Sequence, residues 1–116
     1  MENIIVIKSK TFSIRIVKLS KYLNDNKKEY VLSKQILKSG TSIGANVKEA
    51  IRGQSKADFY AKMNIALKEA SETEYWLEIL NETDYIDKAL FESIYSDCTE
   101  LIKILMSITK TQKCDS

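Results

Sequence analysis

The stretch KSGTSIGANVKEA, residues 38–50, places Gly40 and Gly44 among small polar side chains. A glycine-rich loop of this kind could hold a phosphate on its backbone N–H groups, which would indicate a nucleotide-using enzyme. Such a loop follows a β-strand and closes with Gly-Lys-Ser/Thr, and the sequence has neither feature here. Residues at helical spacing run straight through this stretch instead: Ser33, Ile36, Gly40, Ile43, Val47 and Ala50. The flanking positions recur every seven residues and widen this stripe: Leu37, Gly44 and Ile51. We therefore predict that the stretch is the middle of a helix.

Glycine inside a helix costs about 1 kcal/mol relative to alanine, so two glycines on an inward stripe need a reason. We predict that Gly40 and Gly44 allow a neighbouring helix to approach closely, with Ala66 and Ala70 of the third helix as partners. In the alternative interpretation, small polar residues of the same helix line a pocket: Ser39, Ser42 and Asn46.

The residues that could bind a metal or perform acid–base chemistry are few. The chain has no histidine, which removes the commonest general base and the commonest zinc ligand. Glutamates 69, 72, 74 and 78 resemble the inward acids of di-iron bundles but fall on several helix faces. We expect no metal, no cofactor and no catalytic residues, and an enzyme that uses carboxylates is the weakest interpretation.

Two cysteines form neither a disulfide framework nor a metal site. Cys98 has the spacing of a core residue, whereas Cys114 lies in a polar tail. No apolar run approaches the roughly 18 residues of a membrane span, and the N-terminal run is too short for a signal peptide. The expected location is the cytoplasm.

Charge is unevenly divided along the chain. Residues 1–56 carry 12 Lys and Arg against 4 Asp and Glu, whereas residues 57–116 carry 6 against 12. Four of the cations share the outward face of the second helix: Lys34, Lys38, Lys48 and Arg52. This line is a candidate nucleic-acid-binding surface. The alternative is an ordinary solvated face whose lysines pair with acids from the second half.

These residues must be positioned by a few long elements, since 116 residues include no proline and three glycines. Apolar periodicity predicts four amphipathic helices, at approximately 5–24, 28–52, 56–82 and 87–110. Polar connectors supply Asn26 as a cap for the second helix, Ser55 for the third, and Asp84 or Asp87 for the fourth. Short connectors predict one all-α domain, residues 1–116, folded as an antiparallel up-down-up-down four-helix bundle.

Two helices carry apolar residues away from the predicted core. These are Ile7, Ile14 and Val17 on the first helix and Ile65, Trp76 and Ile79 on the third. A bundle helix that is apolar on two sides commonly meets another chain, so we predict self-association through these residues. Coverage by a connector or by the N-terminus is the alternative.

Residues 35–80 resemble a bacterial family, the 23S rRNA intervening sequence proteins, whose members are often encoded within insertions of that rRNA gene. The matching motifs are Ser42-Ile43-x-x-Asn46, Arg52-x-x-Ser55-x-x-Asp58-Phe59, and Ile65-Ala66-x-x-Glu69-Ala70 leading into Glu72-x-Glu74. The family is related to the accessory variability determinant proteins of diversity-generating retroelements.

The resemblance implies a helical bundle that assembles into a ring, typically a homopentamer, and it carries over no catalytic residues. In the retroelement branch it implies a basic scaffold for nucleic acid and a reverse transcriptase. The chain lacks the proline that many members carry before the second helix, and its net charge of +2 is milder than in that branch. From the resemblance and the basic face of the second helix together, we expect an oligomer that binds RNA or DNA. A protein-interaction scaffold, for example for a reverse transcriptase, is the alternative.

Overall fold

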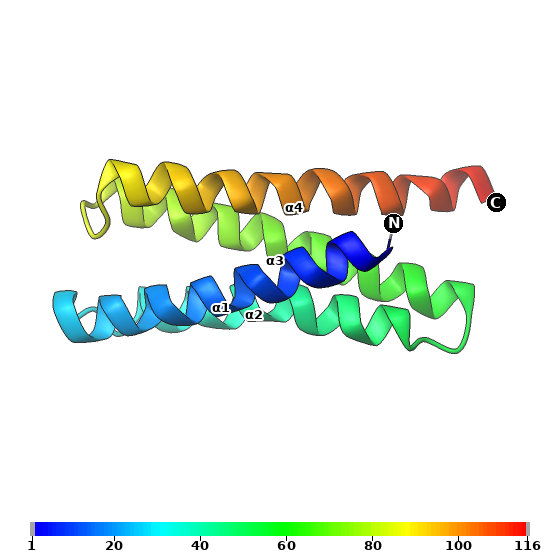
Figure 1. Ribbon diagram of the computed structural model, residues 1–116, viewed down its shortest axis with the longest axis horizontal. Helices are drawn as coiled ribbons and strands as arrows, with labels where there is room; N and C mark the ends of the chain where they lie inside the picture. The colour runs from blue at the N-terminus through cyan, green and yellow to red at the C-terminus, as the bar shows by residue number, and fades with distance from the viewer. Residues whose placement is uncertain (1, 116) are drawn as a thin grey trace.

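The computed structural model describes residues 2–115, and the side chains of residues 4–111. Its four helices are α1 (Glu2–Lys27), α2 (Leu32–Ile51), α3 (Lys56–Glu82) and α4 (Lys88–Asp115). They run up and down along a body of 47 × 21 × 20 Å, as Figure 1 shows. The predicted all-α antiparallel four-helix bundle is confirmed.

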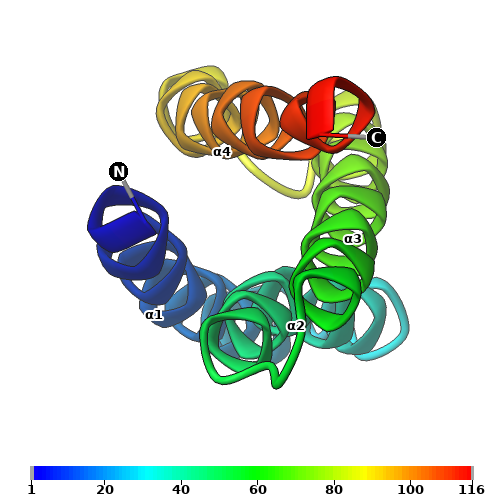
Figure 2. The same cartoon turned by 90° about the vertical axis from the view of Figure 1, so that its right-hand side faces the viewer.

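The helices follow one another around an arc, with α1 and α4 at its two ends (Figure 2). Each helix packs against the next one in the chain, and the seam between α1 and α4 is the least packed of the four. Side-chain ion pairs cross this seam. The Arg15 guanidinium lies 2.7 Å from the Asp97 carboxylate and also donates to the Ser93 hydroxyl at 2.7 Å, and the Lys8 ammonium lies 3.1 Å from Glu100.

The core follows the predicted periodicity closely. All six residues of the predicted stripe through α2 are buried: Ser33, Ile36, Gly40, Ile43, Val47 and Ala50. The predicted inward residues of α1 are buried as well: Phe12, Ile16, Leu19 and Leu23. Cys98 is fully buried on α4, as predicted. Small exceptions are Phe59, Phe91 and Ile108, which are half-buried at the edges of the core.

The helix boundaries differ from the prediction at the C-terminus, where α4 ends five residues later, and at the first connector, where α1 ends three residues later and α2 begins four residues later. α1 continues to Lys27, so Asn26 is inside a helix and the prediction that it caps α2 is wrong. The chain leaves α1 at Lys28, whose φ of 54° is left-handed. Glu29 then caps the next helix from outside, because its carboxylate accepts the N–H groups of Val31, Leu32 and Ser33 at 3.2, 3.0 and 2.8 Å.

The other connectors use the predicted caps. The Ser55 hydroxyl accepts the N–H of Asp58 at 3.1 Å at the start of α3. Of the two candidates for α4, Asp87 is the cap, and its carboxylate accepts the N–H of Leu90 at 2.8 Å. Asp84 lies in the turn before it with a left-handed φ of 64°.

Gly40 and Gly44 lie inside α2, as predicted, but they face α1 and not α3. A Cβ added at Gly40 would lie 2.8 Å from both Cγ atoms of Ile16, and one at Gly44 would lie 3.2 Å from the Ser13 hydroxyl and 3.3 Å from the Ser9 carbonyl oxygen. Ala66 and Ala70 are buried in α3 but are not the closest neighbours of the glycines. The predicted close approach is therefore present, and the predicted partner is wrong.

Candidate nucleic-acid interface

The four predicted phosphate-binding cations of α2 are all exposed: Lys34, Lys38, Lys48 and Arg52. At 1.5 Å per residue they extend over about 27 Å of helix, and we call them the basic stripe. Within the described part of the chain, no acid pairs with any of the four. Two acids of the second half, Glu100 and Asp97, pair instead with Lys8 and Arg15 of α1.

The basic stripe divides into two halves with different surroundings. Lys34 and Lys38 border neither of the two hollows described below. Lys48 and Arg52, one helical turn apart, border both hollows. The sequence predicted a uniform line of cations, whereas in the structure only Lys48 and Arg52 of the four border the hollows.

The first hollow lies between α1 and α2 and has a volume of about 510 Å³. We call it the α1–α2 groove. Its lining consists of Val6, Ser9, Lys10, Ser13, Gly44, Ala45, Lys48, Ile51 and Arg52. Three of these residues are cations and none is an acid, so the groove favours anions.

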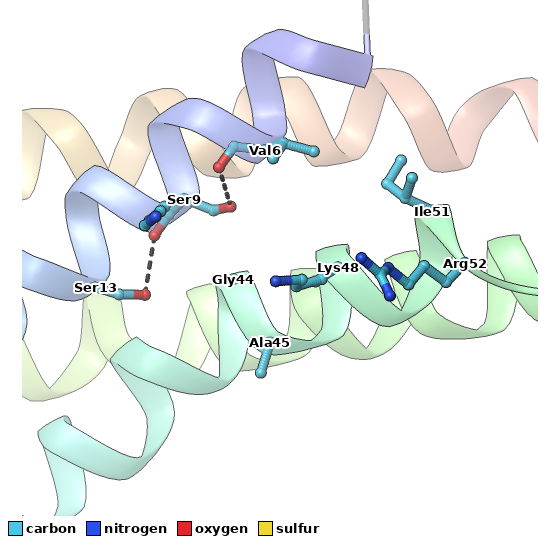
Figure 3. A pocket seen from close by; sticks show the side chains of 9 residues that line it. Val6, Ser9, Ser13, Gly44, Ala45, Lys48, Ile51 and Arg52 are labelled. Carbon is cyan, nitrogen blue, oxygen red and sulfur yellow. Dashed lines mark hydrogen bonds between the residues drawn. The ribbon is translucent and has the colours of Figure 1, made fainter.

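Small residues shape the groove on both sides (Figure 3). The Ser9 hydroxyl donates to the Val6 carbonyl at 3.3 Å, and the Ser13 hydroxyl donates to the Ser9 carbonyl at 3.0 Å. Because these hydroxyls are bonded to their own helix, they remain available to a ligand as acceptors only. Positive charge on the rim therefore dominates what the groove can bind.

The second hollow, of about 730 Å³, lies on the other side of Lys48 and Arg52. Its lining includes Glu49 and Asp58, and Glu49 pairs with Lys62 at 3.0 Å. Mixed charge makes this hollow a weaker anion site than the α1–α2 groove.

Sequence reasoning missed two features of this surface. One is Lys10 of α1, which joins Lys48 and Arg52 at the groove. The sequence signal for it is indirect: the small residues Ser9 and Ser13 on α1 have the same four-residue spacing as the two glycines of α2. Tyr30 is 58% exposed in the α1–α2 connector, close in sequence to Lys34. Neither the partner of α2 nor the exposure of a connector residue follows from periodicity.

The alternative polar pocket of Ser39, Ser42 and Asn46 does not form. The Ser39 hydroxyl is buried 2.9 Å from the Thr73 hydroxyl. Ser42 and Asn46 donate to carbonyl oxygens of their own helix at 2.6 and 2.8 Å. None of the three borders either hollow.

The residues predicted to form an oligomer interface are exposed to different degrees. Ile7 is 63% exposed and Ile14 51% exposed on α1, and Val17 and Ile65 are less so. Trp76 and Ile79 of α3 are half-buried. Trp76 packs against the core and donates its indole N–H to Glu72 at 3.1 Å. The larger apolar surface is therefore on α1, and the interface stays a prediction.

Acidic and thiol groups have local structural partners. The Tyr95 hydroxyl donates to Glu78 at 2.7 Å, which raises the pKa of that phenol. Burial raises the pKa of the Cys98 thiol to about 12, so it is a poor nucleophile and metal ligand.

Over the part of the chain that the structure describes, no three His, Cys, Asp or Glu side chains form a group that could hold a metal. No helix in that part has the length and apolarity to span a membrane.

Comparison with known proteins gives a match to a family and matches to solved structures. A family model described as 23S rRNA-intervening sequence protein matches residues 1–107. A crystal structure from Bacteroides thetaiotaomicron, described as a protein with unknown function from the S23 ribosomal protein family, is 58% identical in sequence. That match covers 94% of this chain and 97% of the other, with a TM-score of 0.92. No curated protein matches the chain.

Proposed function

The chain belongs to the family of 23S rRNA-intervening sequence proteins, and from this premise we propose that it is a non-enzymatic, homo-oligomeric protein that binds RNA through the basic outer face of α2. The observation that carries the proposal is the basic stripe, whose four cations are exposed and have no acidic partner among the described residues. What distinguishes the basic stripe from other unpaired cations is its arrangement, since its four cations follow one face of α2 over about 27 Å.

Binding of this kind gains free energy when the cations displace counterions from phosphates. The basic stripe itself contains no aromatic side chain that could stack on an unpaired base. Contact therefore falls on the backbone and on the shape of the nucleic acid, with little sequence preference.

Self-association multiplies the stripe. The family resemblance implies a ring of five copies, and each copy would bring four cations to one assembly. When one copy is bound, the next binds at a high effective concentration, so the avidity of the ring exceeds the affinity of a single chain.

A salt titration of RNA and DNA binding tests the proposal. We compare the wild type with a variant in which Lys34, Lys38, Lys48 and Arg52 are all replaced by Gln. Log affinity for a duplex should fall with log salt in the wild type, and the slope should decrease by about 0.9 for each phosphate contact removed.

The matched control replaces four exposed cations elsewhere, Lys18, Lys21, Lys68 and Lys103, by Gln. It removes the same charge and should retain most of the affinity. Equal affinities for the stripe variant and the wild type, or equal losses in the two variants, would contradict the proposal. Light scattering on all three proteins checks that oligomeric mass is unchanged.

A protein-interaction scaffold is the second candidate, and the exposed apolar residues of α1 favour it. Its partner would be another protein, for example a reverse transcriptase, and nucleic acid would be secondary. Undiminished partner binding by the stripe variant would favour this function over the first.

A further inference from the structure

The α1–α2 groove has features that backbone binding along the basic stripe does not require. It borders Lys48 and Arg52 but not Lys34 and Lys38, and its volume of about 510 Å³ lies within the range of small-molecule sites. Lys10 adds a third cation from the opposite helix.

Apolar side chains complete the groove. Val6 of α1 and Ile51 of α2 project into the space between the two helices from opposite sides, and Ala45 contributes a small side chain (Figure 3). Ile51 is 42% exposed although it is a large apolar residue at the end of a helix. A ligand that fits this lining has an apolar part and a concentrated negative charge.

We propose that the groove binds a 5′-phosphorylated nucleotide, with the phosphate held by Lys48, Arg52 and Lys10 and the base against Val6 and Ile51. A terminal phosphate carries about −1.5 to −2 charges at pH 7, whereas an internal phosphodiester carries one. Three cations with no acid in the lining match the terminal group better. The Arg52 guanidinium can bind two phosphate oxygens at once.

The same chemistry has two sources, a free nucleotide and the 5′ end of an RNA chain. Either satisfies the inference, which goes beyond the proposed function because it requires neither a duplex nor an oligomer.

Calorimetric titration with AMP, adenosine and inorganic phosphate tests the site. We expect AMP to bind at least tenfold more tightly than either fragment. The double variant Lys48→Gln/Arg52→Gln should lose at least tenfold in AMP affinity. The matched double variant Lys34→Gln/Lys38→Gln removes the same charge from the part of the stripe outside the groove and should bind AMP as the wild type does.

Ile51→Ser tests the apolar wall separately. It should weaken AMP binding several-fold and leave the affinities for phosphate and for duplex RNA unchanged, because Ile51 lines the groove but is not part of the basic stripe, whereas Lys48 and Arg52 belong to both. Oligonucleotides with a 5′-phosphate or a 5′-hydroxyl, used as competitors of AMP, identify the source. Stronger competition by the phosphorylated form indicates an RNA end. Equal competition by both forms, which RNA bound along the stripe would produce by covering Lys48 and Arg52, or no competition by either, indicates a free nucleotide.

Three results would overturn the inference. One is phosphate binding as tightly as AMP, which would reduce the groove to a simple anion patch. The second is an equal loss in the Lys34/Lys38 control. The third is no AMP binding by a wild type that remains folded by circular dichroism.

Discussion

At the scale of single residues, the glycines of α2 have the clearest physical role. Gly40 faces Ile16 so closely that a methyl group has no room, and Ile16 is branched at Cβ and cannot swing away. Gly44 lies against the backbone of Ser9. Both glycines therefore set how near α1 lies to α2, which in turn determines the shape of the α1–α2 groove.

Gly40→Ala should lower the free energy of unfolding by about 1 kcal/mol, because overpacking costs about 1–3 kcal/mol and the better helix propensity of alanine offsets about 1 kcal/mol. Urea unfolding measures the change. In an Ile16→Ala background the obstruction is gone, and the same substitution should become stabilising. A stabilising effect in both backgrounds would show that α1 does not restrict Gly40.

At the scale of elements, the turn between α1 and α2 depends on one carboxylate. Glu29 is almost fully buried and accepts three backbone N–H groups at the start of α2. Those groups would otherwise have no partner, because the first N–H groups of a helix cannot bond within it. The turn thus fixes where the basic stripe begins.

Glu29→Ala should destabilise the protein by about 1–3 kcal/mol, since buried N–H groups lose a charged acceptor. Glu29→Gln retains one acceptor oxygen and should lie between the alanine variant and the wild type. Asp25→Ala, an exposed acid beside the same turn, serves as the control in thermal unfolding. The prediction is wrong if Glu29→Ala and Asp25→Ala have equal, small effects.

Sequence periodicity predicted the elements well because each helix has its own buried stripe, and Ser33 to Ala50 illustrates this. The first connector could not be predicted in the same way, since a left-handed Lys28 and a cap supplied by Glu29 leave no periodic signal. The four cations of the stripe were predictable as outward residues. The α1–α2 groove was not, because its cation Lys10 comes from a helix whose packing partner the period does not specify.

At the scale of the whole molecule, the apolar surface of α1 is the feature that a single chain leaves unexplained. Ile7 and Ile14, which lie about two helical turns apart, are both more than half exposed. Burial of such residues against a second copy would stabilise an assembly by the hydrophobic effect.

Ile14→Glu should reduce the mass measured by light scattering while leaving helix content by circular dichroism unchanged, because a carboxylate in an apolar interface loses its hydration. Met106→Glu changes an equally exposed apolar residue of α4 and should leave the assembly intact. Monomeric masses for the wild type and both variants would refute self-association.

The open order of the helices has a consequence for local unfolding. α2 and α3 each pack against a neighbour on both sides, whereas α1 and α4 each have one close neighbour and a seam held partly by exposed ion pairs, which stabilise little. Amide hydrogens should therefore exchange most slowly in α2 and α3 and faster in α1 at low protein concentration. If copies associate through α1, exchange in α1 should slow as protein concentration rises, because association stabilises the folded form of that helix over its locally unfolded form. Native-state hydrogen exchange at two concentrations would measure both effects, and α1 protection equal to that of α2 at each concentration would contradict them.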